Sequence, residues 1–152
     1  MAFRFKFEHL LRLALHNESE VKTRLALKDG QIAQVDQTLA KNKEDYEMAM
    51  DEKAADLIAG RMEKTRMYFA YFIRLEKAKE YFLEERGRLV TQREKIVQEL
   101  AEKRRVRKVY EKLKERHETR FQKAELKRDQ KLMDEFASRA GRHDEEVPEP
   151  DA

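Results

Sequence analysis

Histidines and carboxylates are the side chains that could carry acid–base or metal chemistry in this chain, and their spacing favours neither. The four histidines are scattered along the sequence, at His9, His16, His117 and His143. None of them stands in a metal-binding spacing such as H-E-x-x-H, and no glycine-rich phosphate loop occurs. Adjacent carboxylates such as Glu84-Glu85 lie in sequence that is charged throughout, which is typical of a solvated face. We therefore expect no enzyme, with no catalytic residues, cofactor, metal or small-molecule substrate.

A run of basic residues at positions 103–108, KRRVRK, could contact the phosphates of a nucleic acid. The basic helices of zipper proteins that bind DNA precede their heptads, however, whereas this run follows them. Acids such as Glu102 and Glu111 interleave with it, although residues 101–143 carry 15 basic and 8 acidic side chains in all. We expect this basic arm to bind an acidic protein surface and not nucleic acid.

An aromatic stretch follows Gly60, the only plausible bend in the middle of the chain. Its rings, at Tyr68, Phe69, Tyr71 and Phe72, point to several sides of a helix because each residue turns by about 100°. Packing against the other helix accounts for some of these rings, but a helix in a two-helix pair buries only one of its sides. We expect Tyr68, Phe69 and Tyr71 to remain exposed for a partner.

The composition is that of long helices. The chain has 152 residues, of which 43% are charged and 40% hydrophobic, and both prolines fall within the last five residues. Because the apolar residues are spread evenly, we expect an all-α rod and no compact core. No apolar run reaches the length of a membrane span, and the start alternates phenylalanine with charge, unlike a signal peptide. The absence of cysteine fits a cytoplasmic location.

Apolar residues from Phe7 to Ala49 recur with the 3-4 spacing of a coiled coil. Ten of the thirteen positions in this frame are apolar, and the exceptions are Glu18, Lys28 and Asn42. The first helix is predicted over about residues 5–58. A bend at residues 59–61 follows, since a glycine after a periodic run ends a helix.

A second frame starts at Phe72 and predicts a helix over about residues 62–140, ended by Gly141. Several of its seam positions are basic: Lys79, Arg86, Arg93, Lys103 and Arg107. We expect residues 1–143 to form a single antiparallel coiled-coil hairpin. Residues 144–152, with five acids and no base, read as a disordered acidic tail.

When the chain folds at Gly60, the seam positions of the two helices face each other in pairs whose residue numbers add to 121. This register sets Glu18 opposite Lys103, for which we predict a charge pair within the seam. It also leaves the second helix beyond about His117 without a partner from the first, so that Phe121 and Phe136 belong to a single basic helix with an apolar stripe.

Three segments resemble a known family. Residues 127–139, KRDQKLMDEFASR, closely resemble the signature near the end of FliJ, a flagellar export protein. The opening at residues 3–13, FRFKFExxLxL, is similar to the start of that family, and residues 68–78, YxxYFIRLEKA, look like its stretch after the bend. The resemblance covers essentially residues 3–140 and includes the length, the hairpin layout and the lack of cysteine.

The resemblance implies a component of the flagellar type III export apparatus. Family members are antiparallel coiled coils similar to the central stalk of rotary ATPases, and they sit in the pore of the hexameric export ATPase. They also bind the cytoplasmic domain of the export gate protein, help it use the proton gradient, and escort export chaperones. The implied location is cytoplasmic, peripherally associated with the inner membrane at the flagellar base, without direct membrane insertion.

The family's two contacts can be carried over to matching residues. The gate contact maps to the helices flanking the bend, at Leu39, Tyr46, Tyr68, Tyr71, Phe72, Leu75, Ala78 and Phe82. This chain departs from the family at Asn42, where an aromatic residue can occur, and at Val35, where a polar one can. The ATPase contact maps to the end where the termini meet, at Phe5, Phe7, Leu11, Arg120, Phe121, Lys127, Arg128, Gln130, Lys131, Asp134 and Phe136.

Two alternatives remain open from the sequence. One is the equivalent stalk of an injection-type secretion system, which has the same fold and a different cargo. The other is a peripheral membrane coiled coil that uses Phe3, Phe5 and Phe7 to hold a lipid surface.

Overall fold

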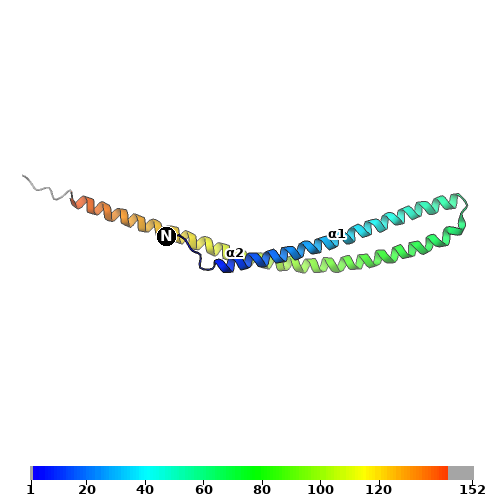
Figure 1. Cartoon of the computed structure of the whole chain (residues 1–152), viewed down its shortest axis with the longest axis horizontal. Coiled ribbons are helices and arrows are strands. Elements are labelled where there is room, and N and C mark those ends of the chain that lie inside the picture. Colours follow the sequence, from blue (N-terminus) through cyan, green and yellow to red (C-terminus); the bar gives the residue numbers. More distant parts are fainter. Residues whose placement is uncertain (1, 144–152) are drawn as a thin grey trace, which may run out of the picture. The chain divides into compact units, whose positions relative to one another are not determined.

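Two long helices make up the computed structural model, which describes residues 2–143 (Figure 1). Helix α1 spans Glu8–Ile58, the short 3-10 helix η1 spans Met62–Lys64, and helix α2 spans Thr65–His143. No strand occurs in this part of the chain. The predicted all-α helical hairpin is confirmed. The acidic tail predicted at residues 144–152 lies outside the described residues.

The second helix does not end where the sequence suggested. Gly141 lies inside α2, which continues to His143, and its backbone is not in the left-handed region. A glycine within a helix costs only about 1 kcal/mol relative to alanine, which is too little to end a helix by itself. The first helix also begins later than predicted, at Glu8 and not near Phe5.

The bend is closed by a glycine that does adopt the left-handed conformation. Gly60 has a φ of 76°, and its N–H donates to the carbonyl of Leu57 at 3.1 Å. The N–H of Arg61 donates to the carbonyl of Asp56 at 2.8 Å. These two bonds form a Schellman motif, which satisfies the last carbonyls of α1 and requires a residue without a Cβ clash at position 60.

Contacts divide the chain into two compact units, which are described separately. One unit comprises Met1–Leu15 with Arg105–Ala152, and the other comprises His16–Arg104. We call the first the terminal unit and the second the bend unit.

In the bend unit, α1 and α2 lie side by side and are joined at the bend (Figure 1). Every position of the predicted frame on α1 from Glu18 to Ala49 is buried or half-buried, including the three polar exceptions. On α2, Phe72, Leu75 and Leu89 are buried as predicted. Lys79 was wrongly placed in the seam, because it is exposed and its neighbour Ala78 is half-buried instead.

The register of the bend unit is visible in its ion pairs between the helices. Asp36 accepts a hydrogen bond from Nε of Arg86 at 2.6 Å, and Asp29 pairs with Arg93 in the same way. In both pairs the residue numbers add to 122, one more than predicted. The two arginines hold half-buried seam positions, so their stems cover apolar surface while their charges meet aspartates of α1.

In the terminal unit, the residues ahead of α1 pack on α2. Phe5 is buried with its ring centroid 5.7 Å from that of His117, and the Phe3 and Phe121 rings are also 5.7 Å apart. Phe7 lies 6.4 Å from His117. The unpaired part of α2 was therefore predicted to begin too early, at about His117, because the segment before α1 extends the pairing as far as Phe121.

Candidate interaction surfaces

The aromatic stretch after the bend is largely a core. Ala49, Tyr68 and Phe72 form a buried cluster, with Tyr46 and Tyr71 packed against it. The Tyr46 and Phe72 rings are 4.8 Å apart. Tyr68 was predicted to be exposed for a partner, and the structure contradicts this because only 7% of its surface is accessible. Of the rings expected to face outward, Phe69 is exposed and Tyr71 is half-buried.

Tyr68 is held by a carboxylate across the bend. Its hydroxyl donates to Oδ2 of Asp56 at 2.7 Å, and Arg61 Nε donates to Oδ1 of the same residue at 2.8 Å. Lys64 Nζ lies 3.8 Å from Oδ2. Asp56 is buried, so its charge is compensated by one hydroxyl and two cations, as a buried carboxylate requires.

These contacts shift two pKa values in opposite directions. The hydrogen bond from Tyr68, followed by that from Arg61, lowers the pKa of Asp56 below its ordinary value of 3.8. The hydrogen bond to Asp56, followed by burial, raises the pKa of Tyr68 from 10.0 to about 12. The stabilisation from Asp56 is thus lost as the pH falls through its lowered pKa, and that from Tyr68 is lost as the pH rises through about 12.

Replacing Asp56 with asparagine is expected to return the pKa of Tyr68 from about 12 toward 10.0, since the negative charge that opposes ionisation is removed. Tyrosine labelled with ¹³C at Cζ would report this ionisation by NMR, and Tyr68→Phe would assign the signal. An unchanged pKa in Asp56→Asn would contradict the contact. Glu52→Gln is the matched control, because that carboxylate has only a minor influence on the same group.

A groove of about 500 Å³ lies between the two helices of the bend unit. Leu39 and Tyr46 of α1 and Leu83 of α2 supply its apolar surface, and two lysines and two glutamates also line it. Leu39 and Tyr46 were predicted as gate-binding residues. Leu83 was not, although its 49% exposure makes it the most accessible apolar side chain of the groove.

The other predicted gate residues do not line this groove. Tyr68, Phe72 and Leu75 are buried, and Tyr71, Ala78 and Phe82 are half-buried. Asn42, which departs from the family pattern, lines the groove and ties the helices together: its Nδ2 donates to the carbonyl of Leu75 at 3.1 Å. A polar residue at this seam position therefore has a partner in the opposite backbone.

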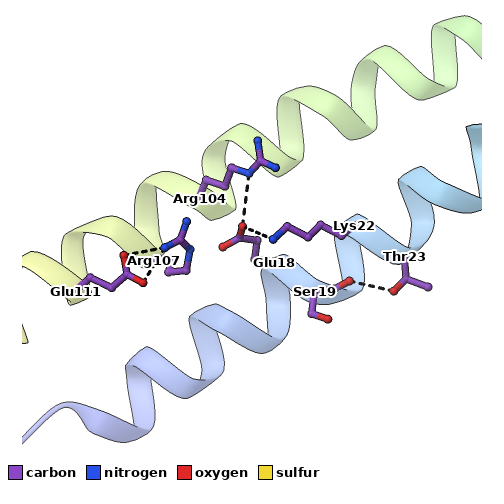
Figure 2. A network of polar contacts seen from close by, with 7 residues as sticks. All are labelled: Glu18, Ser19, Lys22, Thr23, Arg104, Arg107 and Glu111. Carbon is purple, nitrogen blue, oxygen red and sulfur yellow. Dashed lines mark hydrogen bonds and ion pairs between the residues drawn. The ribbon is translucent and has the colours of Figure 1, made fainter.

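A second polar position interrupts the seam of the bend unit at Glu18, which is only 3% exposed (Figure 2). Its Oε1 lies 2.9 Å from Nζ of Lys22 and 3.5 Å from Nε of Arg104. The predicted partner Lys103 was wrong by one residue, in line with the shift of the register. Glu18 joins the helices by an ion pair at a place where an apolar residue would leave the register less defined.

The terminal unit divides the predicted ATPase-binding residues into two groups. Phe5 and Leu11 are buried, and Phe7 and Phe121 are half-buried, so these four hold the unit together and present little surface. The rings of Phe3, Phe5 and Phe7, which the membrane alternative would use, also contact α2. The remaining predicted residues are exposed: Arg120, Lys127, Arg128, Gln130, Lys131, Asp134 and Phe136.

From residue 126 to residue 141 every side chain of α2 is exposed, and we call this stretch the arm. Its apolar residues are open over more than half of their surface: Leu126 by 67%, Leu132 by 52%, Met133 by 73% and Phe136 by 66%. Leu126 was missed in the sequence, although it precedes Met133 by two helical turns and falls on the same side.

Two further properties bear on function. Among residues 2–143, no helix is long and apolar enough to cross a membrane. Within the same residues, no group of three or more histidine, aspartate or glutamate side chains could hold a metal ion.

The sequence matches a known protein family over most of its length. The family described as flagellar FliJ protein matches residues 3–146, nearly the whole chain. No curated protein and no solved structure matches. The members of this family are non-enzymatic components of flagellar protein export. The chain therefore belongs to the FliJ family and is a component of the flagellar export apparatus.

Proposed function

We propose that this chain is the stalk of the hexameric export ATPase and that it couples the ATPase to the export gate. The observation that carries the proposal is the arm, whose apolar side chains are exposed over more than half of their surface. Exposed apolar surface of this kind marks a binding site, because its burial by a partner is favourable.

The arm also has charges that suit a pore with an acidic lining. Arg120 and Lys123 lead into it, and Lys127, Arg128 and Lys131 lie within it. Apolar side chains of the arm would anchor it, while the cations speed the encounter and orient the helix.

The decisive experiment adds the purified chain to a purified type III export ATPase. Stalk function predicts that the chain promotes assembly of the hexamer, seen as a shift in mass by light scattering, and raises the rate of ATP hydrolysis. An ATPase whose assembly and hydrolysis stay the same at saturating concentrations of the chain would overturn the proposal. The chain alone serves as the control for contaminating hydrolysis.

The groove of the bend unit is the proposed contact for the cytoplasmic domain of the gate protein. It joins apolar surface from Leu39, Tyr46 and Leu83 with charges of both signs, a combination that suits an amphipathic segment of a partner. Escort of export chaperones and support for the use of the proton gradient belong to the same proposal through the family.

Replacing Leu83 with glutamate is expected to weaken gate binding by about tenfold or more, because an apolar contact becomes a charge in the groove. Val97→Glu makes the same change at a half-exposed position of α2 outside the groove and should bind like the original chain. Calorimetry with the isolated gate domain would measure both. Equal affinities of the two variants would remove the groove from the contact.

A further inference from the structure

The arm and the turn before it carry most of their positive charge on one side. A helix advances by about 100° per residue, so five cations fall within about half of its circumference. We call this side the cationic face, and it is formed by Lys123, Lys127, Arg128, Lys131 and Arg139. Asp134 and Glu135 share it and offset part of the charge. Met133 and Phe136 project from the other side of the helix by the same rotation.

Among the described residues, Arg128 is the one cation of this face with a carboxylate partner: its Nη1 lies 3.4 Å from Oε1 of Glu125. The arginines of the bend unit differ, since Arg86 and Arg93 each meet an aspartate. A group of unpaired cations on one exposed side attracts an acidic segment, and the attraction is strongest for one that is tethered nearby.

The chain contains such a segment directly after α2. Residues 144–152 have five acids and no base. Nine residues span at most about 30 Å when extended. Since a helix rises 1.5 Å per residue, this length covers about twenty residues of α2, back to about Lys123.

We propose that residues 144–152 turn back at the end of α2 and occupy the cationic face. Charge and reach select this segment as the occupant, because its acids and the cations of the face lie within the same span of chain. A partner with an acidic surface then has to displace the segment before it binds the cationic face, whereas the side that carries Met133 and Phe136 stays accessible. For the export ATPase, this competition rests on the function proposed above.

Distances between spin labels test the contact without any partner. The chain has no cysteine, so Ala124→Cys with Ala152→Cys gives a single pair of labelling sites. The helix from residue 124 to residue 143 is about 28 Å long. Pulsed EPR should give distances mostly below about 28 Å at low salt, since the segment returns along the arm, and longer ones in 1 M salt, where charges are screened beyond about 3 Å.

A variant with a neutral tail is the matched control. It replaces Asp144 and Asp151 with asparagine, and Glu145, Glu146 and Glu149 with glutamine, which keeps size and removes charge. The distances between the spin labels in this variant should exceed those in the original chain at low salt and should not change with salt. Coinciding distance distributions of the two chains would overturn the proposal. Labels at Ala124→Cys and Ala137→Cys, both on α2, should report one distance in all conditions.

Binding to the export ATPase then tests the competition. If the segment covers the face for most of the time, the neutral-tail variant should bind roughly three- to tenfold more tightly at low salt, and the difference should vanish at high salt. A distance change without any change in affinity would refute the competition. If neither chain binds the ATPase, the proposed stalk function fails, and the EPR distances still decide whether the segment occupies the face.

Discussion

Replacing Met133 and Phe136 together with aspartate is expected to weaken binding to the export ATPase by at least about 100-fold and to abolish its stimulation. Both side chains are exposed over more than half of their surface and lie on one side of the arm. Apolar anchors at the centre of an interface typically contribute about 2 kcal/mol or more each, and an aspartate at such a place would also have to lose its hydration. Titration of the ATPase with each chain measures the loss.

The double aspartate variant should fold like the original chain, so that a loss of binding can be assigned to the altered side chains. Substitutions at exposed positions change the free energy of unfolding by about 0.5 kcal/mol or less, so the thermal transition followed by circular dichroism should stay the same. Val106→Asp with Val109→Asp is the matched control, because these exposed valines are also three residues apart on α2 and lie outside the arm. A control that lost binding as severely would show that added negative charge is the cause.

Replacing Phe72 with alanine is expected to destabilise the bend unit by about 3–5 kcal/mol. Phe72 is buried in the cluster with Ala49 and Tyr68, and its ring lies 4.8 Å from that of Tyr46. Truncation removes the buried ring and leaves a cavity that two long helices can close only in part. Urea denaturation followed by circular dichroism gives the change in free energy.

Phe69→Ala provides the comparison, since Phe69 precedes Phe72 by one helical turn and is 54% exposed. Its ring meets Nζ of Lys53 at 4.5 Å, and the loss of this exposed contact should cost about 1 kcal/mol or less. Equal costs at the two positions would contradict the assignment of Phe72 to the core. The two variants also separate effects on folding from effects on binding, because Phe69→Ala should weaken binding to a partner that contacts the exposed rings.

The paired helices were predictable because the heptad frame depends on the spacing of apolar residues, which the sequence displays directly. The frame placed Val21 and Leu100 in the seam, and both are buried. The ion pairs Asp36–Arg86 and Asp29–Arg93 follow the predicted register to within one residue, since two frames of the same period can meet in few ways. The shift of one residue matters for side chains that need a specific partner, and Glu18 meets Arg104 where Lys103 was expected.

The side chains outside the periodic pattern were predicted less well. From the sequence, Tyr68 was predicted to be exposed, because its partner Asp56 lies on the other side of the bend and no periodicity relates the two residues. Phe3 and Phe5 precede α1, so the frame gave no sign that they would pack on α2. Both errors concern contacts that depend on how the chain turns at an element's end, which heptad spacing does not encode.

The contacts across the bend unit join residues at regularly increasing separations along the chain. Tyr68 and Asp56 are 12 residues apart, Arg86 and Asp36 are 50 apart, and Arg24 and Glu99 are 75 apart. Closing the widest loop directly costs more entropy than closing the narrowest by about 1.6 kcal/mol, but each contact becomes easy once the one inside it exists. We therefore expect the unit to fold from Gly60 outward, one contact after another. A force that separates residues 24 and 99 should open the pairs in sequence towards Gly60, and they should close in the reverse order when the force is released.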